Sequence, residues 1–361
     1  MKAVGIVILV LLIVVAGVAG WFWLSIEYPY RGFSRQGVFV DLPHGASTRA
    51  VARLLKENGV IRSALAFRIY ARRHPKRRLQ AGEYRFDHAI SGHDVFWQIA
   101  DGHIYEQPFT VREGETIFDI ARELEAGKFM SASEFLAAAK NPELVRDMSP
   151  KATTLEGFLY PATYHLPRHP VAVELTAEMV KKFKEEWNRI AATAPIAPSS
   201  AIAGPIVTLA SLVERETPKP DERPLVAGVF ENRLSKNMRL QCDPTVIYAL
   251  EQTGQYQGTL TGDDLRFDSP YNTYEHGGLP PGPIGNPGEV SLTAAMSPEK
   301  TPFLYFVANT QGGHFFAATL EEHNRNVTRY RRMLAGLPPD PPPPAAVAKK
   351  GSSTRHKGTA R

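Results

Sequence analysis

The stretch VFVDLPHGASTRAVARLLKENGVIRSALAF, residues 38–67, predicts the fold class of this chain. It begins with a short strand, turns at Gly45, and continues as an amphipathic helix whose apolar residues recur three and four positions apart. Ser63 then provides a favourable N-cap for a second helix. A strand and two helices in one short stretch indicate an α+β protein.

A second stretch, PFTVREGETIFDIARELEAGKFMSASEF at residues 108–135, repeats this pattern, with Ser131 as the N-cap of its second helix. A strand–helix–helix unit with a glycine turn resembles LysM-type glycan-binding modules, although a plain structural spacer has the same pattern. Both interpretations stay open, and we favour the spacer. The matching residues of the two stretches include Gly45 and Gly114, Ser47 and Thr116, Leu55 and Leu124, and Phe67 and Phe135.

The segment before the first stretch, residues 3–26, contains no charged residue. At about 1.5 Å per helical residue it is long enough to cross the ~30 Å hydrocarbon core of a bilayer. Trp21, Phe22 and Trp23 near its end are typical of an interfacial aromatic belt. The alternative is a signal peptide cleaved near Ala19. We favour an anchor over residues 1–26, because the segment exceeds the roughly 7–15 apolar residues of a signal peptide.

Basic residues gather in two places. We interpret the run Arg72–Arg78 as a solvated loop, with contact to an anionic envelope polymer as the alternative. The Pro-rich tail, residues 336–361, is predicted to be disordered. Because residues 341–361 of the tail carry five cations and no acid, they equal the whole net charge of +5. The basic composition therefore supports nucleic-acid binding only weakly, and we expect no nucleic-acid partner. The cations concerned are Lys349, Lys350, Arg355, Lys357 and Arg361.

The segment IVTLASLVERE, residues 206–216, is an apolar helix that ends in two carboxylates. Burial disfavours the charged form of a carboxyl and raises its pKa, as a general acid requires. Glu214 and Glu216 lie about 200° apart around a helix, so they cannot both point into one cleft. Periodicity does not choose between them. In the alternative interpretation, both are solvated acids at a helix end, paired with Arg215 or Lys219.

The stretch SPYNTYEHGGLPPGPIGNP, residues 269–287, predicts a long loop, and long ordered loops in compact domains are usually functional. Its aromatic, amide and hydroxyl groups suit sugar rings, although a Pro-rich structural loop with core tyrosines is the alternative. The histidines lack HExxH spacing, the single cysteine, Cys242, permits no internal disulfide, and no phosphate or dinucleotide loop is evident. We therefore expect neither a metal nor a cofactor.

From the anchor to about Met333, the chain resembles the MltG/YceG-like family of endolytic murein transglycosylases. The resemblance implies LysM-like modules over residues 36–150 and a catalytic domain over residues 151–335. Two residues depart from the family pattern: Ala162 replaces the usual Asp, which puts a direct role for that position in doubt, and Cys242 replaces Thr or Ser. The matching motifs are TLEGFLYPATY (154–164), LASLVERE (209–216), FENRL (230–234), LQCDPTVIYAL (240–250), SPYNTY (269–274), GLPPGPIGNPG (278–288), and LYFVAN and GHFFAATLEEHN beyond them.

The resemblance also implies the site and the reaction. Glu214 becomes the catalytic acid and then the base, in a cut between N-acetylmuramic acid and N-acetylglucosamine that leaves a 1,6-anhydro end. The implied substrate contacts are Glu156, Asn232, Arg233, Gln241, Asp243, Thr245, Tyr248, Tyr271, Asn272, Thr273 and Tyr274.

Peptidoglycan glycan strands are the implied partner, reached from the periplasmic side of the inner membrane by a single-pass protein. Peptidoglycan synthases and proteins of the elongation and division machinery are further expected neighbours. A two-carboxylate hydrolase is the alternative enzyme, with Asp243, Asp263, Asp264 or Glu156 as the second group. A non-catalytic glycan-binding membrane scaffold is the alternative from another class.

Overall fold

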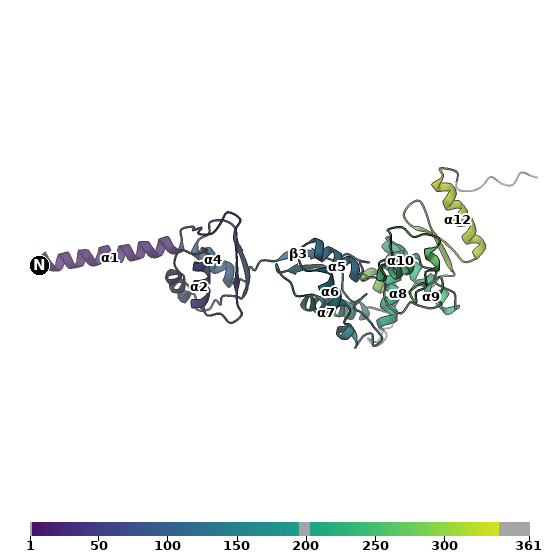
Figure 1. The fold of residues 1–361 in the computed structure, drawn as a ribbon, viewed down its shortest axis with the longest axis horizontal. Helices are drawn as coiled ribbons and strands as arrows, with labels where there is room; N and C mark the ends of the chain where they lie inside the picture. The colour runs from purple at the N-terminus through teal and green to yellow at the C-terminus, as the bar shows by residue number, and fades with distance from the viewer. Residues whose placement is uncertain (1, 195–202, 339–361) are drawn as a thin grey trace, which may run out of the picture. The chain divides into compact units, whose positions relative to one another are not determined.

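The computed structural model describes residues 2–194 and 203–338. Of the tail that is predicted to be disordered, everything from residue 339 onward lies outside the described residues. Helices and short paired strands occur together, as Figure 1 shows, and they confirm the α+β class.

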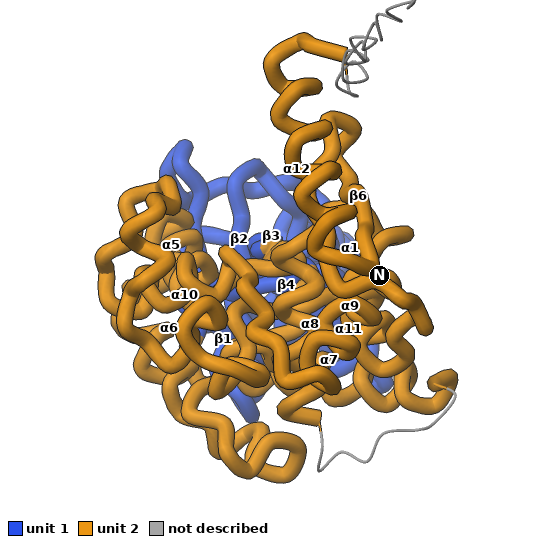
Figure 2. The backbone as a smooth tube through the Cα atoms, turned by 90° about the vertical axis from the view of Figure 1, so that its right-hand side faces the viewer, with its two compact units in different colours: residues 1–109, 163–170 blue, residues 110–162, 171–361 orange. Residues whose placement is uncertain are grey.

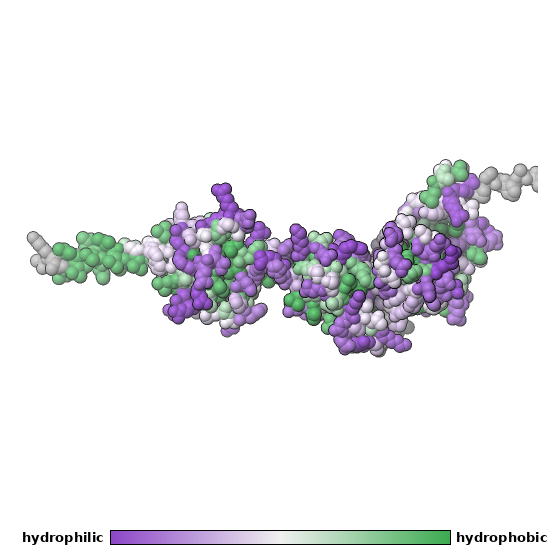
Figure 3. Space-filling model, in the orientation of Figure 1, coloured by the Kyte–Doolittle hydropathy of each residue, from purple (hydrophilic) through white to green (hydrophobic). Residues whose placement is uncertain are grey.

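The N-terminal helix α1 (Lys2–Ile26) is long and apolar enough to cross a membrane. Its span Val4–Ile26 has a mean hydropathy of 2.9 and carries no charged residue, and the space-filling view in Figure 3 shows a hydrophobic surface over most of its length that becomes paler toward its C-terminal end. Only its last turn is covered, because Ser25 and Ile26 are buried.

The chain divides into two compact units, which Figure 2 distinguishes by colour. Unit 1 comprises Met1–Phe109 with Thr163–Pro170, and unit 2 comprises Thr110–Ala162 with Val171–Arg361. The first repeated stretch lies in unit 1, and nearly all of the second lies in unit 2. These compact units do not test the boundary between functional domains that we expect at residue 150, which stays a prediction.

Unit 1 has a core of apolar side chains between a two-stranded antiparallel sheet and three helices. Val40 of β1 lies opposite Tyr84 of β2, and both side chains are buried. The side chain of Ser63 caps α3 as predicted, by accepting a hydrogen bond from the Ala66 N–H. The elements are β1 (Val38–Leu42), α2 (Thr48–Glu57), α3 (Ala64–Arg73), β2 (Gly82–Phe86), α4 (Gly92–Ala100), and the strand pair β3 (Gln107–Thr110) and β4 (Thr163–Leu166).

The repeated pattern of strand, glycine turn and two helices is confirmed at both places. Gly45 and Gly114 adopt φ values of +74° and +80°, which glycine reaches without strain. In unit 2 the side chain of Ser131 caps its helix as predicted. This local pattern does not by itself identify a LysM module, so the likeness to LysM modules stays a prediction.

Unit 2 is mainly helical, and its central element is α8 (Ala203–Glu216), which is buried at almost every position from Val207 to Glu214. Helices α9, α10 and α11 pack against α8, and α7 packs against α11. A β5–β6 hairpin carries α12. The remaining elements are α5 (Ile117–Ala126), α6 (Ala132–Ala139), η1 (Pro142–Val145), α7 (Ala172–Ala191), η3 (Pro220–Glu222), α9 (Arg223–Ser235), α10 (Asp243–Gln252), η4 (Asp264–Arg266), α11 (Glu289–Met296), β5 (Tyr305–Ala308), β6 (His314–Ala317) and α12 (Leu320–Leu334).

The Pro-rich loop before α11 runs across α8 and is tied to it. Within this loop, the backbone N–H of Ile284 donates to the Ser211 hydroxyl of α8 over 3.0 Å. The helix thus brings its own last turn and the end of the loop to one place, where the candidate site lies.

Candidate active site

Glu214 lies in the last turn of α8, and its side chain is only 4% exposed. Its Oε1 accepts from Nη2 of Arg223 over 2.6 Å, and its Oε2 accepts from the backbone N–H of Gly288 over 3.0 Å. Arg223 begins α9, and Gly288 is the N-cap of α11. Three helix ends therefore meet at one carboxyl group.

Arg223 also binds a second carboxylate, that of Glu113. Its Nη1 lies 3.3 Å from Glu113 Oε2, so one guanidinium bridges two acids. The side chain of Arg223 is 6% exposed, whereas that of Glu113 is 47% exposed. Gly288 lets Glu113 come close, because a Cβ at that position would lie 2.0 Å from the Glu113 carboxylate.

Sequence reasoning missed both Glu113 and Arg223. They stand 110 positions apart in the chain, and neither belongs to a motif that carries chemistry by itself. The one available signal was position, since Glu113 directly precedes Gly114 of the repeated turn.

The surroundings raise the pKa of Glu214. Burial is the main cause, and the negative charge of Glu113 adds to it. The Gly288 N–H and the charge of Arg223 act in the opposite direction, followed by a smaller contribution from Ser291 on α11. The carboxyl thus holds a proton more readily than an exposed glutamate, while groups that stabilise its charged form stand beside it.

Glu216 faces different neighbours. The Cys242 thiol donates to its Oε2 over 3.2 Å, and burial, followed by the charge of Asp243, raises its pKa to about 7. The interpretation of both acids as solvated helix-end groups is wrong, because tertiary contacts enclose each of them. Arg215, offered as their partner, instead donates to the backbone carbonyls of Gly114 and Ile284.

Glu156 is fully buried beneath the loop. Its carboxylate accepts from the backbone N–H of Ile117, at the start of α5, over 3.1 Å and from Asn286 Nδ2 over 3.1 Å. Burial raises its pKa to about 8, although the hydrogen bond from the Ile117 N–H and one from Tyr248 oppose the shift. Its contacts hold α5 and the loop together.

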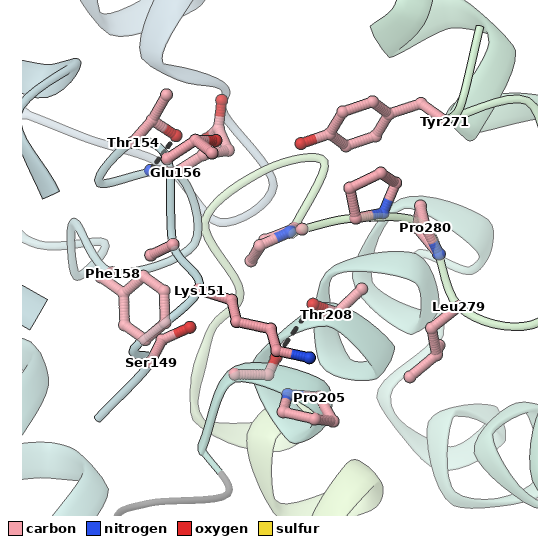
Figure 4. A pocket seen from close by; sticks show the side chains of 16 residues that line it. Ser149, Lys151, Thr154, Glu156, Phe158, Pro205, Thr208, Tyr271, Leu279 and Pro280 are labelled. Atoms are coloured by element: carbon pink, nitrogen blue, oxygen red, sulfur yellow. Dashed lines mark hydrogen bonds between the residues drawn. The ribbon is translucent and has the colours of Figure 1, made fainter. Parts of the chain in front are cut away.

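Among the described residues of unit 2, two hollows are lined by these acids. A cavity of about 150 Å³, drawn in Figure 4, has Glu156 and Tyr271 on its wall, and the Tyr271 hydroxyl points toward Glu156. A wider groove of about 340 Å³ contains Glu214. The groove is strongly polar, since its other lining residues are Arg112, Glu113, Gly114, Glu115, Asp119 and Arg215.

The other expected substrate contacts divide by exposure. One group is buried or partly buried and bonded to backbone. Asn232, which is partly buried, donates to the carbonyls of residues 301 and 303. The buried Arg233 donates to the carbonyls of residues 239, 240 and 304, and the buried Asn272 to those of residues 265 and 267. Thr245 and Thr273 are also buried, joined through their hydroxyls over 2.9 Å. Tyr248 is buried and packs on Tyr271, with ring centroids 5.0 Å apart.

The second group reaches the surface. Gln241 and Asp243 are exposed, Tyr271 and Tyr274 are half-buried, and the Tyr274 hydroxyl donates to Asp243. Among the described residues, none of the expected substrate contacts lines the groove of Glu214. Their role in binding substrate stays a prediction.

The chain is similar to known proteins over most of its length. The model of the YceG-like family matches residues 40–329. An endolytic murein transglycosylase of Bacillus subtilis is 32% identical over 323 residues, which cover 85% of this chain and 88% of that protein. One of Streptococcus pneumoniae D39 is 31% identical over 332 residues, covering 84% of this chain and 60% of the relative. A crystal structure of a yceG-like protein from Listeria monocytogenes matches 81% of this chain and 99% of its own, with 34% identity and a TM-score of 0.52.

Proposed function

This chain belongs to the YceG-like family, and on that premise we propose that it is an endolytic peptidoglycan transglycosylase anchored in a membrane. It cleaves the β-1,4 bond between N-acetylmuramic acid and N-acetylglucosamine within nascent glycan strands and leaves 1,6-anhydro ends. The observation that carries the proposal is the carboxyl of Glu214, buried at the wall of an open polar groove with a raised pKa.

In the proposed reaction, protonated Glu214 donates its proton to the glycosidic oxygen as the bond to the anomeric carbon breaks. The resulting carboxylate removes the proton from the muramic 6-hydroxyl, whose oxygen bonds to the same anomeric carbon. Burial favours the protonated form at the start, and Arg223 and the Gly288 N–H stabilise the charged form between the two transfers. No water is consumed.

The expected substrate residues take two roles in this proposal. Gln241, Asp243, Tyr271 and Tyr274 present polar or aromatic groups at the surface and serve as contacts to sugar rings. The buried and partly buried residues, including Glu156, Asn232 and Arg233, act by holding the loops around those contacts.

A two-carboxylate hydrolase is the second candidate, and the pairing of Glu113 with Glu214 through Arg223 is the observation that favours it. In that mechanism Glu113, rather than the partners expected from sequence, would activate a water.

Digestion of glycan strands in water enriched with heavy oxygen separates the two candidates. We expect mass spectrometry of the products to find 1,6-anhydro ends that carry no label, because the new bond is made to the 6-hydroxyl of the same sugar. Reducing ends that carry heavy oxygen would instead establish the hydrolase. An absence of any cleavage by the full chain, against a positive-control muramidase on the same strands, would favour the non-catalytic scaffold.

Glu113→Gln is expected to move the high-pH limb of the activity profile to lower pH. The Glu113 charge raises the pKa of Glu214, whereas Arg223, the Gly288 N–H and Ser291 lower it. Without the Glu113 charge only burial still raises this pKa, so the pKa falls and Glu214 loses the proton that it must donate at a lower pH. The measurement is kcat/KM against pH.

Glu123→Gln is the matched control, because it also removes one negative charge. The Glu123 side chain, on α5, pairs with Arg112 and not with Arg223. It is expected to leave the profile in place. A Glu113→Gln profile that coincides with the wild type, or that moves upward, would contradict the role assigned to Glu113.

The membrane location is part of the proposal: α1 serves as a retained single-pass anchor in the inner membrane, with both units on the periplasmic side. The support is its unbroken apolar length together with Ile26, which is 1% exposed and belongs to the core of unit 1. Direct glycan binding by a LysM-like region, and proximity to peptidoglycan synthases and the elongation and division machinery, are proposed with it.

A further inference from the structure

We propose that α1 and the end of α3 together form a binding site for an anionic phospholipid. A groove of about 800 Å³ runs along the outer part of α1 and ends at α3. Its α1 side is apolar, from Val14 and Val18 to Phe22, and its α3 side is formed by Ile69 and Arg73. An acyl chain fits the first part, and a negatively charged headgroup fits the second.

The position of Arg73 relative to the aromatic residues places it at the level of lipid headgroups. Tryptophan and other aromatic side chains near the end of a membrane span sit at the interface between hydrocarbon and water. Trp21, Phe22 and Trp23 line the groove, and the Arg73 guanidinium lies 5.0 Å from the centre of the Phe22 ring. A cation held at this depth meets lipid phosphate groups.

Helix α3 has the pattern of a helix that lies on a membrane surface. Leu65, Ile69 and Arg73 are four positions apart and therefore share one face. Leu65 is 55% exposed although it is apolar, and Ile69 lines the groove beside α1. An apolar face that ends in cations is typical of interfacial helices. The membrane that α1 enters would cover this face.

The charge near the groove is positive. Arg72 and Arg73 form the last turn of α3, which corrects the interpretation of the run Arg72–Arg78 as a loop throughout. Lys76 follows in an exposed turn, and Glu27 is the single acid that lines the groove. Cations near an anionic leaflet contribute about 1 kcal/mol each. Arginines in a last turn also stabilise the helix end, but that role involves no lipid.

This inference rests on the proposed anchor and is independent of the glycan chemistry. Its test uses the full chain in bilayer nanodiscs that contain phosphatidylcholine with or without phosphatidylglycerol. The variant Arg72→Gln/Arg73→Gln removes Arg73, which lines the groove, together with Arg72, its neighbour in the last turn of α3. The control Arg49→Gln/Arg53→Gln removes the same charge from exposed positions of α2 in the same unit.

The measurement is the ratio of the two lipids that stay bound when each protein is released from nanodiscs and weighed by native mass spectrometry. We expect wild type and control to retain phosphatidylglycerol in preference to phosphatidylcholine. In the groove variant that preference is expected to fall by about 30-fold, since the two lost charges contribute about 1 kcal/mol each. Unchanged thermal midpoints in the variants exclude unfolding as the cause.

Equal preference in all three proteins would overturn the inference, and so would an equal loss in the variant and the control, which indicates general charge attraction. A chain that does not enter nanodiscs at all would refute the anchor itself. Glycan cleavage by the same samples is expected to be unaffected, so failure of the lipid site and failure of the proposed activity are distinguishable.

Discussion

Glu214→Gln is expected to reduce the turnover of glycan strands by about 10³–10⁴-fold, because one side chain performs both proton transfers and each general acid or base step contributes about 10²–10⁴-fold. Glutamine keeps the shape of the side chain, and its one amide oxygen can still accept a hydrogen bond from Arg223 or from the Gly288 N–H. It cannot give or take the proton. The measurement is kcat on purified strands, with the anhydro product quantified by mass spectrometry.

Glu216→Gln is the matched control, since it makes the same change two positions along the same buried helix. Its carboxyl faces Cys242 and Asp243 instead of the groove of Glu214, and we expect a loss of less than about 10-fold. An active Glu214→Gln variant beside an inactive Glu216→Gln variant would transfer the catalytic role to Glu216. Two inactive variants with normal thermal midpoints would refute the assignment of both proton transfers to a single residue.

Asn286→Ala is expected to lower the free energy of unfolding of unit 2 by about 3–5 kcal/mol, because a removed partner leaves buried polar groups unsatisfied. The side-chain oxygen of Asn286 accepts from the Leu159 N–H over 2.9 Å, and its Nδ2 donates to the Glu115 carbonyl and to Glu156. All three partners would lose a hydrogen bond at a buried position, where no solvent water takes the place of the amide. At about 2–4 °C per kcal/mol, the thermal midpoint falls by about 6–20 °C.

Asn286→Ala is also expected to reduce activity at temperatures well below its thermal midpoint, where the chain is still folded. Asn286 positions the loop end whose next residues present the Gly288 N–H to Glu214. Asn188→Ala, an identical change at an exposed position of α7, is the control and is expected to alter the midpoint by less than about 2 °C. Equal shifts in the two variants would refute the structural role of Asn286.

Local features of the fold could be predicted from sequence because local chemistry determines them. The uncharged run of α1, the capping serines Ser63 and Ser131, and the turn glycines Gly45 and Gly114 each act within a few residues of their own position.

The role of a polar side chain is less visible in sequence. The side-chain N–H groups of Asn232, Arg233 and Asn272 can donate equally well to a sugar hydroxyl or to a backbone carbonyl. Their bonds to backbone are known only when the carbonyls are placed, and the partners of Asn232 come from about 70 positions further along the chain.

The sequence by itself determined an apolar span, the repeated strand–helix–helix pattern, and a buried helix ending in two acids, of which family motifs favoured Glu214. Tertiary structure alone decided what surrounds that acid. It brought Glu113, Arg223 and Gly288 from three separate segments to one carboxyl group. The pKa of a buried acid depends on charges and hydrogen-bond donors within a few ångströms, and proximity of that kind is a property of the packed chain.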